Sequence, residues 1–186
     1  MVDKMEIEQY CRELSPPDVD RAIKFNEVSR DEAIISYELF LGQNKVPRQI
    51  FIQGYNAMYA ASALFLAKKY KIKLDEHLGS THKNMRLILE FYTRDSEHHS
   101  KLIGLYEIAI EKFQKLSQQY SNENHFAKRV VKDLMEDGYH KGKKVTYYTD
   151  LVPGRKDPLL LDASDAKEFI QDVVKPFLFI IGELTK

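Results

Sequence analysis

The sequence predicts an all-α protein: a single-domain, up-and-down helical bundle with one irregular loop before its last helix. Most of the chain places apolar side chains three or four residues apart, which is the spacing of one face of an α-helix. Capping residues, prolines and short polar breaks separate these stretches. A chain of 186 residues is long enough for one full core and short for two. We therefore assign residues 1–186 to one domain.

The N-terminal part is expected to begin with a helical extension over residues 1–15, in which Met5 to Leu14 has amphipathic spacing. A long helix should follow from about Asp18 to Leu41. Ser29 and Glu32 match a capping box, a pair of side chains that satisfy free N–H groups where a helix begins. This stretch is therefore either one helix or two helices with a break near Ser29.

The central helix is expected from Pro47 to about Tyr70. Proline suits the first turn of a helix, and the lysines close to Tyr70 suit the last. Alanines and large apolar residues cover most of its circumference, and such a helix is buried by several neighbours. It should therefore form the centre of the bundle.

Two further helices are expected from Thr81 to Tyr92 and from Asp95 or Ser96 to about Tyr120. The polar residues 121–124 should end the second of them, and a third helix should follow to about Asp137. Each of them carries apolar side chains at helical spacing.

The expected irregular loop spans residues 138–162, where basic, aromatic and β-prone residues precede a Pro-Gly turn signal. Asp162 or Ser164 should cap a final helix that ends near Leu184. Pro176 should kink this helix, because proline removes one helical hydrogen bond.

Composition narrows the classes of function. The 28 basic and 28 acidic residues give a formal net charge of zero, so no global charge favours nucleic acid or a membrane surface. The single cysteine, Cys11, excludes an internal disulfide and fits a reducing cytoplasm. The charged N-terminus does not resemble a signal peptide, and no apolar run reaches the length of a membrane span. We expect a soluble, cytoplasmic protein with no membrane partner.

Three blocks of sequence, in this order, resemble the HEPN domain family of prokaryotic all-helical proteins. The first is Tyr55–Phe91, where a Tyr- and Ala-rich helix precedes Ser80-Thr81-His82-Lys83 at the start of a second helix. The second is the basic stretch Lys141–Tyr148, and the third is Asp165–Ile170, which opens the final helix. The resemblance spans about Asp18 to Thr185.

The resemblance implies an up-and-down bundle that often forms a homodimer. Many members of the family are toxins paired with a small nucleotidyltransferase antitoxin, and others act in RNA-processing systems. Active members resemble metal-independent endoribonucleases that use an Arg, then four to six further residues, and then a His. Arg94 and His99 fit this spacing. His can remove the 2′-OH proton, and Arg can hold the charged phosphorane.

A second candidate site lies mostly in the basic and aromatic loop. Lysines neutralise phosphates and tyrosines stack on bases, so this cluster suits a nucleotide or RNA. The resemblance adds a phosphate contact by His82. The candidate phosphate-binding residues are Tyr139, His140, Lys141, Lys143, Lys144, Tyr147 and His82. The alternative is that the loop is solvated and its tyrosines pack on the bundle.

No other chemistry is indicated. The six histidines lack the spacing of a metal site, so we expect no metal and no cofactor. Three functions remain open: an accessory protein that contacts nucleotide or RNA phosphates or a nucleotidyltransferase partner; an endoribonuclease toxin using Arg94 and His99; and a dimeric interaction module without chemistry. The first is preferred.

Overall fold

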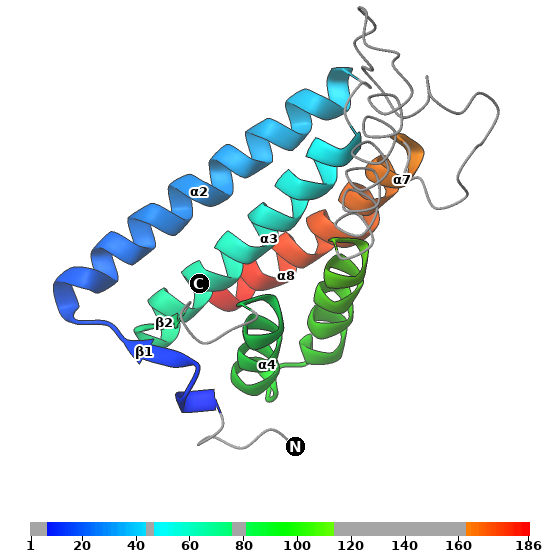
Figure 1. Cartoon of the computed structure of the whole chain (residues 1–186). Coiled ribbons are helices and arrows are strands. Elements are labelled where there is room, and N and C mark those ends of the chain that lie inside the picture. Colours follow the sequence, from blue (N-terminus) through cyan, green and yellow to red (C-terminus); the bar gives the residue numbers. More distant parts are fainter. Residues whose placement is uncertain (1–6, 44–46, 76–80, 114–162) are drawn as a thin grey trace, which may run out of the picture. The chain divides into compact units, whose positions relative to one another are not determined.

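The computed structural model describes residues 7–43, 47–75, 81–113 and 163–186. All of them belong to one compact unit, which comprises Met1–Phe113 and Asp162–Lys186. The described residues are mostly helical and include a two-stranded sheet (Figure 1). The all-α expectation is confirmed at the level of fold class. The single domain over 1–186 and the HEPN type of the bundle stay predictions.

Helices α2 (Pro16–Gln43) and α3 (Pro47–Tyr70) lie side by side and run in opposite directions (Figure 1). Helix α2 is continuous, so the one-helix alternative is correct and no break forms near Ser29. Val19, Ala33 and Tyr37 share one helical face of α2 and are buried. Helix α3 ends where the sequence predicts it to end.

Helix α3 is the core helix, with buried residues all along its length. By length and composition it could cross a membrane, but 72% of its most apolar window is buried inside the protein. That burial is typical of the central helix of a soluble protein. It agrees with the expected central helix that several neighbours cover.

Two short strands correct the expected helical extension. Strand β1 (Cys11–Glu13) pairs antiparallel with β2 (Ile72–Leu74). The prediction that residues 11–13 are helical is therefore wrong. Lys71 adopts a left-handed φ of 58°, which ends α3 and turns the chain into β2. The pairing joins segments far apart in sequence, and this tertiary contact overrides the local amphipathic spacing.

Helix α4 (Thr81–Thr93) has the expected bounds to within one residue. Residues 94–98 form a turn, and residues 99–113 are helical. The helix expected to start at Asp95 or Ser96 therefore starts a few residues later. The predicted elements between Gln114 and Leu161, including the loop 138–162 up to that point, lie outside the described residues.

The last helix consists of α7 (Ala163–Glu168), the π-helical segment η1 (Phe169–Val174) and α8 (Lys175–Thr185). The π-helical segment ends just before Pro176, the residue at which the sequence predicts a kink. At Lys175 the N–H donates to the carbonyl of Ile170, five residues back, instead of the usual four. The π segment accommodates the proline ring and its missing N–H group without ending the helix.

Gly54 is the point of closest approach between α3 and the π segment. A Cβ atom there would lie 2.7 Å from Ile170 Cδ1 and 3.0 Å from both Phe169 Cε1 and Val174 Cγ2. Phe169 also packs on Phe51, with the ring centroids 5.0 Å apart. The missing side chain of Gly54 therefore sets how closely the last helix packs on the core helix.

Candidate functional site

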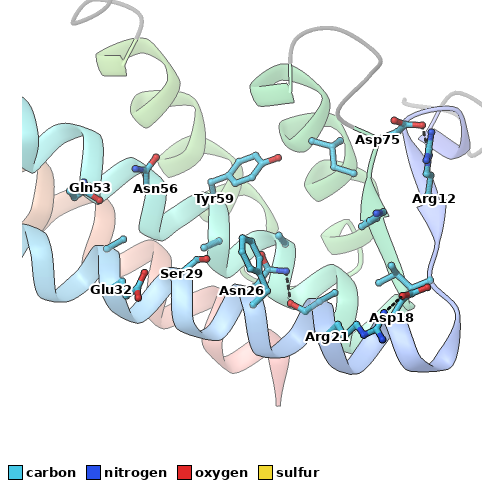
Figure 2. Close-up of a pocket in the computed structure, with 18 of the residues that line it drawn as sticks. Arg12, Asp18, Arg21, Asn26, Ser29, Glu32, Gln53, Asn56, Tyr59 and Asp75 are labelled. Carbon is cyan, nitrogen blue, oxygen red and sulfur yellow. Dashed lines mark hydrogen bonds and ion pairs between the residues drawn. The ribbon is translucent and has the colours of Figure 1, made fainter.

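An open groove of about 1060 Å³ lies between α2 and α3 and is bordered at one end by the two strands. We call it the α2–α3 groove (Figure 2). Its lining is Arg12, Glu13, Leu14, Asp18, Arg21, Ala22, Phe25, Asn26, Ser29, Glu32, Ala33, Ser36, Gln53, Asn56, Tyr59, Ala60, Ala63, Lys73, Leu74 and Asp75.

Amide and hydroxyl side chains run along the middle of the groove. Figure 2 shows Gln53, Asn56 and Tyr59 on α3, with Asn26 and Ser29 on the facing side of α2. Alanines on both helices line the same groove, at the three- and four-residue spacing of one helical face. Small residues let another chain approach closely, and amides can both donate and accept hydrogen bonds. The groove therefore suits a polar, uncharged surface such as a protein segment.

Charges of both signs gather at the end of the groove next to the strands. Arg12 pairs with Asp75 at 2.7 Å, and Arg21 pairs with Asp18 at 3.6 Å. Of the lining side chains, Arg12, Arg21 and Lys73 are basic, whereas Glu13, Asp18, Glu32 and Asp75 are acidic. A polyanion needs a surface of mainly positive charge, so the groove does not favour RNA.

A buried polar chain lies next to the groove; we call it the tyrosine–histidine network. The hydroxyl of Tyr55 lies 2.6 Å from His82 Nδ1 and 3.3 Å from the hydroxyl of Tyr106. All three groups are satisfied when Tyr106 donates to Tyr55 and Tyr55 donates to His82. Tyr59, which lines the groove, also packs edge-on against His82. The network thus supports the groove wall at Tyr59 from the side of the protein core.

Burial is the main cause of the altered acidities in this network. It raises the pKa of Tyr55 to about 12, and it raises the pKa of Tyr106 well above its usual value. It lowers the pKa of His82, because a half-buried ring is poorly solvated as a cation. At neutral pH the network is therefore uncharged. It acts as a structural polar chain, which is the local hydrogen bonding that a histidine at a helix start can provide.

The lowered pKa of His82 predicts a loss of stability in acid. The unfolded chain, with a His pKa near 6.5, binds the proton more tightly than the folded protein, so the free energy of unfolding should fall as pH drops below about 6.5. His82→Asn keeps an acceptor for Tyr55 without the titration and should flatten this dependence. Urea unfolding of the wild type and of His82→Asn at pH 7.5 and pH 5.0 measures the free energy of unfolding at each pH. An equal loss of stability in both proteins between these pH values would show that His82 is not its cause.

Arg94 and His99 are close in sequence, but each makes its own local contacts. The guanidinium of Arg94 lies 4.6 Å from the centre of the Phe91 ring and pairs with Asp95 at 3.7 Å. His99 Nδ1 lies 3.1 Å from the hydroxyl of Thr93, which is buried. Among the described residues, no hydrogen bond or ion pair joins Arg94 to His99. In the described residues, Arg94 and His99 thus contact different side chains around the turn after α4.

The rest of the predicted phosphate site lies outside the described residues. Tyr139, His140, Lys141, Lys143, Lys144 and Tyr147 all belong to the undescribed range 114–162. His82, by contrast, is placed in the tyrosine–histidine network. In the part of the chain that the structure describes, no group of three or more His, Cys, Asp or Glu side chains could hold a metal ion.

The groove was not predicted from the sequence. Ser29 and Glu32 match a capping box in the sequence, but both lie inside a continuous helix and line the groove. A usable signal was the row of amides and hydroxyls beside the apolar positions of the two longest helices. Only the packing of α2 against α3 shows that the two rows face one cavity.

Comparison with known proteins identifies no relative of this chain. No protein-family model, no curated protein and no solved structure matches the chain. The resemblance to the HEPN family therefore stays a prediction. The function has to be argued from the groove, the network and the sequence.

Proposed function

We propose that this protein is an accessory binding module of HEPN-like type, which holds a protein partner in the α2–α3 groove and performs no chemistry of its own. The observation that carries the proposal is the lining of the groove, where amides, hydroxyls and alanines make up half of the residues and the charged residues are of both signs. Such a surface suits the backbone and small side chains of a protein segment better than the phosphates of a nucleic acid.

The resemblance to the HEPN family suggests the class of partner, a small nucleotidyltransferase in the cytoplasm. A contact between nucleotide or RNA phosphates and residues 139–147 is compatible with this role and stays a prediction. The local partners of Arg94 and His99 support a module without ribonuclease activity, because a catalytic pair needs both side chains directed at one phosphate.

The first test separates binding from catalysis. The purified protein, Arg94→Ala and His99→Ala are incubated with a mixed RNA pool in EDTA. We expect no cleavage by any of the three. Cleavage by the wild type that is lost in both variants would replace this proposal with the toxin mechanism.

The second test concerns the groove. A small nucleotidyltransferase is sought among the neighbouring genes, the protein is co-expressed with it, and the complex is isolated. Asn56→Arg should weaken the complex by about tenfold or more, because it places a long, charged side chain in the part of the groove that the partner would occupy. Lys101→Ala, on an exposed position outside the groove, serves as the control. A complex that survives Asn56→Arg unchanged, or no complex at all, would contradict the proposal.

A further inference from the structure

Charge is distributed unevenly along the α2–α3 groove. Six of its seven charged lining residues lie at the end next to the strands, and they cancel because three are basic and three are acidic. The seventh is Glu32, which lies toward the opposite end, near Gln53 and Asn56 (Figure 2). The end of the groove away from the strands therefore carries one net negative charge among uncharged polar groups.

The carboxylate of Glu32 is free to bind a cation from outside. Its side chain is exposed, and among the described residues it makes no ion pair and no hydrogen bond. Other acidic residues of α2 differ in this respect, since Glu27 pairs with Lys68 at 2.7 Å and Asp31 pairs with Arg30 at 2.8 Å. An ionised carboxylate only accepts hydrogen bonds, and its strongest partners are the side chains of Lys and Arg.

The amides beside Glu32 are also free. Within the described ranges, the side chains of Gln53 and Asn56 form no hydrogen bond. The two residues are three positions apart on α3, so they share one face and are separated by about 4.5 Å along the axis. Each amide offers two donors and an acceptor, which match the N–H and C=O groups of a peptide backbone.

Free amides favour an extended occupant over a helical one. A helix pairs its backbone N–H and C=O groups internally, whereas an extended chain leaves them available to the groove. Arg21 and Glu32 are about 16 Å apart along the axis of α2. An extended chain advances by about 3.3 Å per residue, so about five residues fit between them.

We infer that the α2–α3 groove binds an extended protein segment of about five residues that carries one Lys or Arg side chain against Glu32. Gln53 and Asn56 hold the backbone of this segment, and the alanines of the groove wall admit its small side chains. The inference rests on the proposed function in taking the groove as the site for a protein partner. It adds the conformation and the charge of the segment that binds there.

The charge of Glu32 discriminates between possible occupants. An acidic segment would place like charges together, and an apolar segment would remove the carboxylate from water without a partner. Both arrangements are unfavourable. A basic side chain is favourable, so Glu32 is expected to act as the residue that sets specificity.

Peptide selection tests this specificity. A phage-displayed library of random dodecapeptides is selected in parallel on the full-length wild type, Glu32→Lys and Glu97→Lys. Peptides enriched on the wild type should share Lys or Arg at one aligned position, and those enriched on Glu32→Lys should have Asp or Glu there. Glu97→Lys makes the same change of charge outside the groove, at a side chain that is 87% exposed. It should select the same peptides as the wild type.

Affinities of one synthetic peptide give the magnitude. The wild-type consensus peptide, followed by fluorescence anisotropy, should bind Glu32→Gln about tenfold more weakly, because a charge-assisted pair is lost. The same peptide with its basic residue changed to Glu should bind Glu32→Lys more tightly than the wild type. Circular dichroism checks that the variants fold, which is expected because Glu32 is exposed and makes no contact that its replacement would break.

Contrary results are equally specific. No enriched peptide, enriched peptides without a shared basic residue, or equal affinity for the wild type and Glu32→Gln would overturn the inference. Enriched peptides with apolar residues every three or four positions would indicate a bound helix and would overturn the extended conformation.

The inference and the proposed function can fail separately. If peptide binding does not depend on Glu32 while Asn56→Arg still weakens the nucleotidyltransferase complex, the inference alone is rejected. If the peptides behave as expected but no nucleotidyltransferase complex forms, the partner class in the proposed function is rejected and the inference stands.

Discussion

Replacing Tyr106 with alanine is expected to lower the free energy of unfolding by about 3 to 5 kcal/mol, the range for deleting a large buried ring. Tyr106 is fully buried at 0% exposure, and its ring packs 5.6 Å from Phe177 and 6.1 Å from Tyr55. The substitution would open a cavity between helix 99–113, α3 and α8. Because small domains are stable by about 5 to 15 kcal/mol, a large part of the stability would be lost.

Tyr106→Phe separates packing from hydrogen bonding. It keeps the ring and removes only the hydroxyl, whose contact with Tyr55 is long at 3.3 Å. Tyr55 keeps its shorter bond to His82. A loss of about 1 kcal/mol is therefore expected. Urea unfolding followed by circular dichroism measures both variants. A loss for Tyr106→Phe close to that of Tyr106→Ala would show that the hydroxyl, and not the ring, dominates.

Gly54→Ala should destabilise the protein even though alanine is the better helix former. The new Cβ would meet three side chains of the π segment, the closest at 2.7 Å. Overpacking of this kind costs about 1 to 3 kcal/mol, and the better helix propensity offsets roughly 1 kcal/mol of it. We expect a net loss of up to about 2 kcal/mol, measured as a shift of the urea midpoint.

Gly182→Ala is the matched control for Gly54→Ala. Gly182 also lies inside a helix, but a Cβ atom there would meet nothing within 4 Å. Only the propensity gain remains, so this variant should be more stable by roughly 0.5 to 1 kcal/mol. If both variants shift stability in the same direction, the close approach at Gly54 does not limit the packing of the last helix.

The helices with clear local signals could be predicted closely from the sequence. Pro47 and the lysines beside Tyr70 mark the two ends of α3, and the structure has these ends. The apolar circumference of α3 correctly predicts its burial by several neighbours. These signals work because capping, proline geometry and helical periodicity act over a few residues.

The strands and the π segment show where local reasoning stops. Cys11–Glu13 and Ile72–Leu74 are each too short to carry a pattern, and they form strands because they pair with each other. At Pro176 the sequence predicts a kink, but it does not predict the π-helical turn before the proline, which packs against Gly54 of α3. Contacts between segments distant in the chain decide both features.

Part of the candidate site could also be found in advance. The tyrosines and the helix start between Tyr55 and His82 stand out in the sequence. In the structure, Tyr55 and His82 meet in the tyrosine–histidine network. Tyr106, the third member, lies on a helix whose apolar stripe gave no sign of a polar contact. The groove needed two helices to be placed side by side before its lining could be recognised.

Interactions between near neighbours in the chain are enough to predict that this protein is mainly helical, where α3 and α4 begin and end, and that α3 is the core helix. Contacts between distant segments set which faces of α2 and α3 line a cavity, which side chains of α2 stay exposed, and which tyrosines meet His82. Those properties depend on how helices are oriented around one another. Small differences in packing, such as the absent side chain of Gly54, set that orientation.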